Sequence, residues 1–206
     1  LTRIVERSTT LSLTLVRREK LSDSIESFFF ESAPQFRFLP GQFLEWSLNH
    51  LNPDSRGTRR WFTIASSPQE PLIQLTTRFA EQSSSFKRAL RNLTIGQTIS
   101  AHGLEGDFVL PSDKTKALVF IAGGIGITPF RSMIQYLLES GEPRDITLFY
   151  AVQKETDLIF ESVLFSAKEA FGLKYVPVVS QASPTWSGLK GRIDSSTLKR
   201  ECPDIT

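Results

Sequence analysis

An uninterrupted apolar run followed by a glycine-rich turn places the strongest limit on how this chain can fold. Residues 117–122 are all apolar, which is typical of a strand buried on both faces of a parallel sheet. The segment from Gly123 to Pro129 then reads Gly-Gly-Ile-Gly-Ile-Thr-Pro. An apolar stripe at helical spacing follows, formed by Phe130, Met133, Ile134, Leu137 and Leu138. This order of strand, tight turn and helix predicts a β-α-β unit with a right-handed crossover.

The helix after the turn carries signals at both ends. Thr128 is the expected N-cap, Pro129 suits the first helical position, and Gly141 suits the C-terminal stop. Three further elements are expected after it, namely a strand over residues 146–151, a helix over residues 160–171 and a strand over residues 175–179. The alternation of strands and helices predicts a parallel sheet.

The glycine-rich turn is also a candidate anion site. It joins a strand to a helix N-terminus, where free backbone N–H groups and the helix dipole favour negative charge. Gly124 and Gly126 would let the backbone approach a pyrophosphate closely. The alternative is a tight strand–helix turn that binds no ligand.

The first half of the chain has short β-rich runs separated by turn signals such as Pro40-Gly41 and Gly96-Gln97. The runs cover residues 11–16, 25–30, 42–48, 60–66, 72–79 and 98–101. Many short strands with regular turns predict a small barrel. We therefore expect an antiparallel β-barrel domain of the Greek-key type over residues 1–112. An α/β parallel-sheet nucleotide-binding domain is expected over residues 113–206.

Composition argues against several function classes. A net charge of +2 gives no strong electrostatic reason to bind nucleic acid or an anionic membrane. One cysteine, Cys202, and two histidines, His50 and His102, make a metal or iron–sulfur site improbable, so we expect no bound metal. The apolar runs are too short to cross a bilayer, and no signal-peptide pattern opens the chain. We expect a cytoplasmic protein, or one at the cytoplasmic face of a membrane complex.

A second informative segment, Arg60-Trp-Phe-Thr-Ile-Ala-Ser-Ser-Pro68, combines a cation, aromatic rings and hydroxyl groups on one expected strand. Such a strand could hold a phosphate, a stacked ring and a ring heteroatom. Taken alone, it also fits an ordinary strand with one surface arginine and a core phenylalanine.

Taken together, these segments resemble the ferredoxin–NADP reductase superfamily, and motifs cover nearly the whole chain in the expected order. Arg60-Trp61-Phe62-Thr63 resembles the flavin motif R-x-Y-[ST], and Gly123 to Pro129 resembles the dinucleotide loop G-G-x-G-I-T-P. The other matching segments are Phe38 to Phe43, Leu93 to Gln97, Gly103 to Phe108, and Trp186 to Ile193.

The resemblance implies a flavin, with FAD preferred over FMN, bound mainly by the barrel. It assigns the flavin phosphate to Arg60, ring stacking to Phe62 and a hydrogen bond near flavin N5 to Thr63, with Trp61 inside the same motif. Phe62 replaces the usual tyrosine, so one phenolic hydrogen bond is lost. Two further segments are implied beside the flavin, namely Thr76-Thr77-Arg78 and Ser83-Ser84-Ser85. The serine run fits a helix N-cap equally well.

The second domain is implied to bind NADH or NADPH. The resemblance puts Gly124 and Gly126 at the pyrophosphate, and Thr128 and Pro129 beside the nicotinamide. NADPH-selective relatives carry an arginine where this chain has Gln181. Lys154 could compensate, but Glu155 beside it would repel a 2′-phosphate, so we favour NADH slightly.

The implied activity is hydride transfer from NAD(P)H to the flavin, in which Thr63 and Thr128 would be the catalytic residues. Electrons would pass to an acceptor that is a protein, an additional domain or a small molecule. Two alternatives stay open: a reductase of ferric chelates or free flavin, and a non-catalytic flavin-binding or regulatory subunit of a larger redox complex.

The end of the chain departs from the family pattern. Cys202-Pro203-Asp204 does not match the family's C-G-P or S-G-P loop, and no apolar strand precedes it. The chain also begins at Leu1 without a methionine, so we expect a fragment. A parallel sheet without that strand is expected to leave one edge unpaired and one face exposed.

Overall fold

The computed structural model describes residues 10–33 and 36–203, so Leu1 and Asp204, named above, lie outside the described residues. Its contacts divide the chain into one unit over residues 1–110 and a second over residues 111–206. The predicted boundary, between residues 112 and 113, lies two residues further along the chain.

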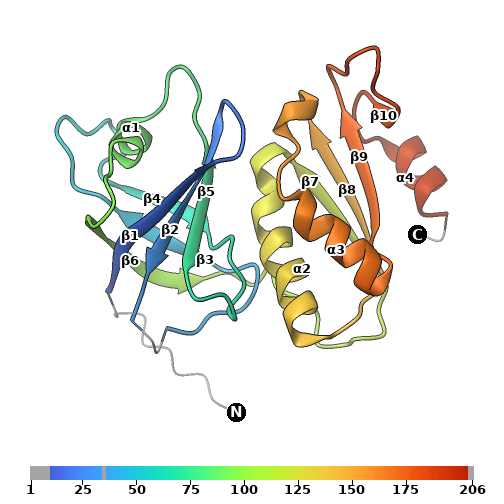
Figure 1. Ribbon diagram of the computed structural model, residues 1–206, viewed down its shortest axis with the longest axis horizontal. Coiled ribbons are helices and arrows are strands. Elements are labelled where there is room, and N and C mark those ends of the chain that lie inside the picture. The colour runs from blue at the N-terminus through green and yellow to red at the C-terminus, as the bar shows by residue number, and fades with distance from the viewer. Residues whose placement is uncertain (1–9, 34–35, 204–206) are drawn as a thin grey trace. The chain divides into compact units, whose positions relative to one another are not determined.

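The first unit is a six-stranded antiparallel sheet in the order β4-β3-β6-β1-β2-β5, curled around one core (Figure 1). Its strands are β1 (Leu11–Lys20), β2 (Ile25–Glu31), β3 (Phe43–Ser47), β4 (Arg59–Thr63), β5 (Ile73–Arg78) and β6 (Thr98–Glu105). Beyond β4, the Ala65 amide donates to the Gln74 carbonyl in β5 over 2.8 Å. This bond links the two ends of the sheet order, and the predicted antiparallel barrel is confirmed.

Alternation along the strands builds the core of the first unit. Leu13 and Leu15 point inward from β1, as the sequence predicts, and Phe30 packs on Trp46 with ring centroids 5.4 Å apart. Helix α1 (Ser85–Arg91) covers this core with Phe86. The sheet thus has an apolar interior that holds the neighbouring strands β3 and β4 in a defined register.

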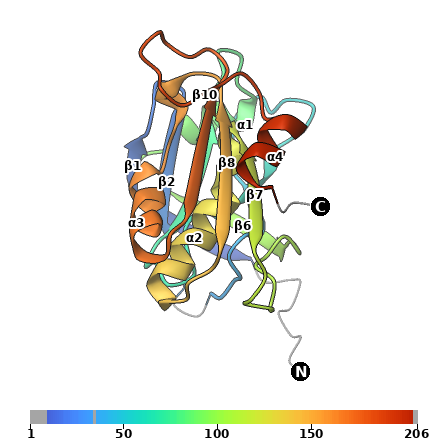
Figure 2. The ribbon, with the colours of Figure 1, turned by 90° about the vertical axis from the view of Figure 1, so that its right-hand side faces the viewer.

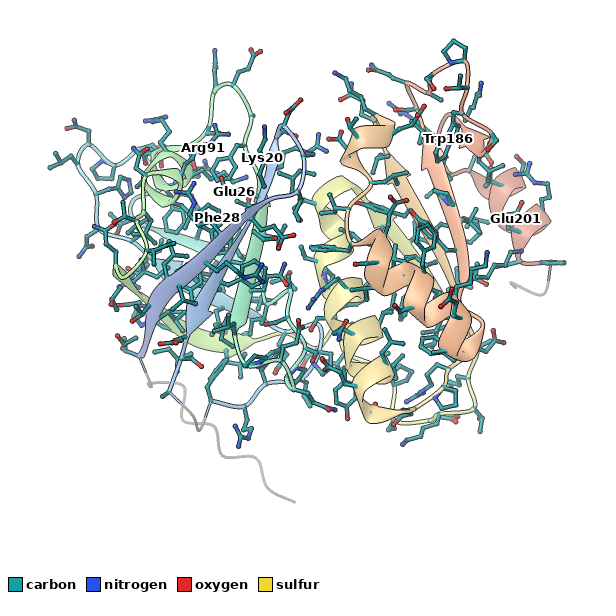
Figure 3. All side chains as sticks on the ribbon, in the orientation of Figure 1. Lys20, Glu26, Phe28, Arg91, Trp186 and Glu201 are labelled. Carbon is teal, nitrogen blue, oxygen red and sulfur yellow. The ribbon has the colours of Figure 1, made fainter. Side chains whose placement is uncertain are left out.

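At one end of the first unit, Lys20, Glu26 and Arg91 lie on the same side of the molecule (Figure 3). They line a small cavity of about 70 Å³ where β1, β2 and α1 approach one another. Glu26 is held there by Arg18, with nitrogen and oxygen 2.6 Å apart. This end is closed by ion pairs and has little room for a ligand.

The second unit is a four-stranded parallel sheet in the order β10-β9-β8-β7. Its strands are β7 (Leu118–Gly123), β8 (Ile146–Val152), β9 (Lys174–Val179) and β10 (Leu189–Lys190). Its helical segments are η1 (Gly124–Ile127), α2 (Thr128–Ser140), η2 (Glu155–Asp157), α3 (Glu161–Phe171) and α4 (Ser195–Glu201). Helices α2 and α3 lie along one side of the sheet and α4 lies on the other (Figure 2). The predicted parallel sheet is confirmed.

Two local predictions in this unit are wrong. The strand over residues 117–122 is not buried on both faces, because β7 ends the strand order and Ile121 is 50% exposed. Among the described strands β7 pairs with β8 alone, as expected for an unpaired edge. Thr128 is not the N-cap: it is the first residue of α2, and Ile127 is the cap without a side-chain bond.

A loop after β9 is built around Trp186, which Figure 3 labels in the second unit. The indole Nε1 donates to the Leu189 carbonyl over 3.1 Å. A Cβ atom at Gly188 would lie 2.6 Å from the indole ring, so only glycine fits beneath it. The Trp-x-Gly pattern of the sequence is therefore a packing requirement of this loop.

No helix in the described part of the chain combines the length and the apolar character that a membrane span requires.

A buried arginine anchors the first residues of the second unit. The Arg144 side chain is 3% exposed, and its guanidinium donates to the carbonyls of Pro111 and Asp113 and to the Glu142 carboxylate. The hydrogen bond from Lys114, opposed by partial burial and supported by Arg144, lowers the pKa of Glu142 below its ordinary value of 4.5. These contacts tie the segment before β7 to the segment before β8.

We expect Arg144→Met to lower the free energy of unfolding by about 2–4 kcal/mol, because two carbonyls lose their buried donor. A carboxyl with a depressed pKa stabilises the fold above its ordinary value and loses that contribution as pH falls. The free energy of unfolding of the wild type should therefore decrease as the pH falls below about 4.5. In the variant the decrease over the same pH range should be smaller. Urea unfolding at several pH values measures both effects.

Arg200→Met is the matched control, because that side chain is 57% exposed and its ion pair with Glu201 lies at the surface. It should change the free energy of unfolding by less than about 1 kcal/mol. Equal effects of the two substitutions would contradict an anchoring role for Arg144.

Candidate functional site

The segment Arg60 to Thr63 lies in β4, and two cavities open beside this strand. The first, which we call the basic cavity, has a volume of about 350 Å³. It is lined by Arg56, Arg60, Trp61, Phe62, Ala80, Gln82, Ser83, Ser84 and Lys87. Three of these side chains are cations, so the cavity has the electrostatic character of an anion site.

The second cavity, which we call the aromatic cavity, has a volume of about 530 Å³ and is lined by Phe43, Trp61, Thr63 and Glu105. Phe43 and Trp61 pack edge to face with ring centroids 5.3 Å apart. Trp61 is 49% exposed and lines both cavities. The two cavities therefore share a wall along β4 and offer space for a ligand with one anionic and one aromatic part.

Arg60 is held firmly at the edge of the basic cavity. Its side chain is 12% exposed, and Nη1 donates to the carbonyls of Arg56, Gly57 and Arg59. Nη2 donates to Asp54 Oδ1 over 2.7 Å. The guanidinium therefore reaches the cavity in one fixed orientation, which lowers the entropy lost when it binds an anion.

Sequence reasoning missed Asp54, which lies in the loop between β3 and β4. Burial by itself would raise the pKa of Asp54, but hydrogen bonds from the Ser85 and Arg56 amides and from Arg60 outweigh it. They hold the pKa of this carboxyl far below its ordinary value, so it stays charged beside Arg60. Its position in a polar loop without a motif gave no sequence signal.

Lys87 of α1 is a second cation at the basic cavity, outside the residues that the resemblance assigns to the flavin. Its Nζ donates to the Arg78 carbonyl over 2.6 Å, and the side chain lines the basic cavity. Burial, followed by the charges of Arg56 and Arg78, lowers the pKa of Lys87. The neighbouring cations raise the free energy of the charged form of Lys87, and an anionic ligand in the cavity would reduce this repulsion.

Phe62 and Thr63 are positioned by the core and by strand pairing. Phe62 packs against Phe86 of α1 with ring centroids 5.7 Å apart, and its carbonyl accepts from Trp46 Nε1. Thr63 pairs with Phe43 in the β3–β4 ladder and faces the aromatic cavity. The motif thus splits between the cavities, with Arg60 and Phe62 at the basic one and Thr63 at the aromatic one.

The other expected flavin residues divide into two groups. Ser83 and Ser84 line the basic cavity, and Ser84 also caps α1 by accepting from the Lys87 amide. Ser85 is buried, and its hydroxyl accepts from the Asp54 amide. Thr76 and Thr77 are also buried and line neither cavity, nor does Arg78.

Thr76 has a structural partner instead of a place at a cavity. Its hydroxyl is hydrogen bonded to Ser27 over 2.7 Å and accepts from Gln74 Nε2 over 3.1 Å. This buried network joins β2 to β5.

The glycine-rich turn of the second unit leaves open space above its backbone. Gly124 has a φ of +50°, a conformation that favours glycine. A Cβ atom at either Gly124 or Gly126 would meet nothing within 4 Å. Thr128 is buried and donates to the Ile125 carbonyl, and Pro129 follows it in the first turn of α2. The backbone at Gly124 and Gly126 can therefore be approached closely by an anion, whereas the Thr128 amide already donates to Ile125 and Pro129 has no N–H.

The carboxyl ends of β8 and β9 meet at the same edge of the sheet. The Gln181 amide donates to the Gln153 carbonyl over 2.8 Å, and the Ser183 amide donates to Glu155 over 2.7 Å. A carboxylate is thus anchored beside Gln181. Ligands of parallel α/β sheets bind at this edge.

Among the described residues, no group of three histidine, cysteine, aspartate or glutamate side chains is placed to hold a metal ion.

Comparison with known sequences gives a consistent result. Residues 120–205 match the oxidoreductase NAD-binding domain family. The chain is 31% identical over 176 residues to the reductase component of phenol 2-monooxygenase from Pseudomonas sp. strain CF600, covering 83% of this chain and 48% of that protein. It is 28% identical to ferredoxin–NADP reductase B of Sorangium cellulosum, covering 88% and 74%. The chain spans about half the length of the first curated relatives it matches.

Solved structures share the fold. A ferredoxin–NADP⁺ reductase from Neisseria gonorrhoeae with bound FAD and NADP superimposes with a TM-score of 0.78 at 21% identity, covering 94% of this chain and 77% of that one. The cytochrome P450 reductase GcoB of Amycolatopsis gives a TM-score of 0.80 at 21% identity, covering 95% and 58%. The curled antiparallel sheet followed by the parallel sheet is therefore the fold of these ferredoxin–NADP reductase-like proteins, and the second unit matches the oxidoreductase NAD-binding domain family.

Proposed function

We propose that this chain is the NAD(P)H-dependent flavoprotein reductase part of an electron-transfer system. The observation that carries the proposal is the pair of cavities along β4, one lined by cations and the other by aromatic rings, with Trp61 shared between them. Their combination suits a flavin nucleotide, which has an anionic phosphate part and a flat aromatic part.

The three cations that line the basic cavity of the first unit favour an anionic ligand such as FAD over a neutral one. Arg60, assisted by Arg56 and Lys87, would hold the phosphate groups, and Ser83 and Ser84 would supply polar contacts at the same cavity. Trp61, which lines both cavities, would support the ring, and Thr63 would donate near its reactive edge. Phe62 lines the basic cavity, so it would lie on the phosphate side of the ring. Bound FAD supplies the hydride-accepting chemistry that no side chain has.

NADH or NADPH would bind the second unit at the glycine-rich turn. The open space above Gly124 and Gly126 would accommodate a pyrophosphate against the backbone of the turn. Thr128 and Pro129 would border the nicotinamide. NADH is favoured over NADPH, because Gln181 carries no charge and Glu155 is anchored beside it, where it would repel a 2′-phosphate.

An electron acceptor would be a protein or an additional domain. Several relatives are named as reductase components of oxygenases or demethylases, among them the glycine betaine monooxygenase reductase subunit of Chromohalobacter salexigens. For this chain we propose a comparable acceptor, and a cytoplasmic location where NAD(P)H is available.

The test is a titration of the purified chain reconstituted with FAD. We expect a yellow protein whose visible absorbance bleaches on anaerobic addition of NADH, and more slowly with NADPH. Stopped-flow absorbance measures both rates. A yellow protein that never bleaches would favour the non-catalytic flavin-binding subunit, and failure to bind FAD or FMN would contradict both functions.

Arg60→Ala should weaken FAD binding by about 1.5–3 kcal/mol, because a charge-assisted phosphate contact is lost. Fluorescence titration of FAD into the apoprotein measures the dissociation constant. Arg59→Ala is the matched control, because its exposed side chain pairs with Glu45 and lines neither cavity. Unchanged FAD affinity in Arg60→Ala would remove this residue from the site.

Gly126→Val should weaken NADH binding by about tenfold or more and leave FAD affinity unchanged, because the branched side chain fills space proposed for the pyrophosphate. The fold should tolerate the change, since a Cβ atom there meets nothing within 4 Å. The NADH dependence of flavin reduction gives the apparent affinity, and Gly126→Ala should have a smaller effect. Wild-type behaviour at limiting NADH would show that the turn binds no pyrophosphate.

A further inference from the structure

Asp54 is fixed by hydrogen bonds at both its side chain and its backbone. Oδ1 accepts from Arg60 Nη2 over 2.7 Å and from the Arg56 amide over 3.0 Å, and Oδ2 accepts from the Ser85 amide over 3.0 Å. The Asp54 amide donates to Ser85 Oγ over 2.9 Å, and its carbonyl accepts from Gly57 over 2.8 Å. The carboxylate therefore joins the β3–β4 loop, the start of α1 and Arg60.

The carboxylate holds Arg60 without occupying the space that a ligand would take. Arg60 is one of the residues that line the basic cavity, whereas Asp54 is not among them. Nη1 of Arg60 is directed to three backbone carbonyls, and Nη2 to Asp54. Nη2 carries two hydrogens and makes one hydrogen bond among the described residues, to Asp54, so a second donor on this nitrogen remains for a ligand.

We propose that Asp54 is a positioning residue for the flavin phosphate: it holds the Arg60 guanidinium in the orientation that contacts the phosphate. The inference rests on the proposed function, because it takes Arg60 as the phosphate ligand. Asp54 itself touches no cofactor in this arrangement and acts through Arg60.

A competing role for Asp54, as an internal anion that a phosphate must displace, fits the contacts less well. A displaced carboxylate would leave the Ser85 and Arg56 amides without their acceptor and would release the loop from α1. Arginine also has enough donors to bind a carboxylate and a phosphate at once. The two roles predict opposite changes in FAD affinity when the charge of Asp54 is removed.

The experiment is a double-mutant cycle between Asp54 and Arg60, read out as FAD binding to the apoprotein. Asp54→Asn keeps one of the two oxygen acceptors that the Arg56 and Ser85 amides use, and it removes the charge that holds Arg60. We expect its FAD dissociation constant to rise about tenfold, in the range of coupling between contacting charged groups. In the Arg60→Ala background the same substitution should change FAD affinity less than about twofold.

A change of net charge alone is controlled by Asp23→Asn, because Asp23 is exposed and pairs with Lys20 at the β1–β2 turn. This variant should bind FAD like the wild type. Asp54→Glu should recover part of the affinity lost in Asp54→Asn, because it keeps a charge for Arg60. Circular dichroism and thermal unfolding identify any variant that does not fold. If Asp54→Asn does not fold, Asp54→Ser carries the cycle, because it also removes the charge that holds Arg60.

Two outcomes would overturn the inference. Tighter FAD binding by Asp54→Asn would show that the carboxylate competes with the phosphate, and equal weakening in both backgrounds would show a structural role that does not pass through Arg60. Failure of the proposed function looks different, because the wild-type chain would then bind no flavin at all.

Discussion

The charge of Arg60, held in place inside the first unit, is the constraint on which the candidate site depends. A guanidinium that is mostly buried needs an acceptor for each donor and a nearby negative charge. Three backbone carbonyls and Asp54 meet most of this need. The same bonds determine the path of the β3–β4 loop and attach it to the start of α1 through Ser85. The shape of the basic cavity and the orientation of its central cation therefore have one physical origin.

The second unit relies on backbone geometry more than on charged side chains. Parallel strands place their carboxyl ends at one edge, and the turn after β7 can be tight because Gly124 adopts a positive φ. The backbone at Gly124 and Gly126 is then free of covering side chains. Under the proposed function, the first unit would hold the flavin with fixed charges and the second unit would hold the dinucleotide against the backbone of the glycine turn.

Local sequence patterns predicted most of the fold, but positions at edges and loops were less accessible. Alternating Leu13 and Leu15 indicated an inward-facing strand, and both are fully buried. The apolar run before the glycine turn predicted a strand buried on both faces, yet Ile121 is half exposed because β7 lies at the sheet edge. The apolar pattern shows which faces of a strand can be buried. The position of the strand in the sheet decides how much of each face is actually covered. The prediction of Thr128 as the N-cap was wrong because the 3₁₀ turn η1 leads directly into α2, so the backbone is already helical before Thr128.

The sequence by itself determined the strands of both sheets and the glycine turn, because short motifs and hydrophobic periodicity report local conformation directly. The resemblance of its motifs predicted Arg60 as the phosphate residue. Only the tertiary structure showed that Asp54 pairs with Arg60 and that Lys87 lines the same cavity. It also showed that Thr76 lies in a buried network with Ser27 and away from both cavities. These assignments depend on contacts between segments distant in sequence. Strand register and loop path decide such contacts, and no single segment encodes them.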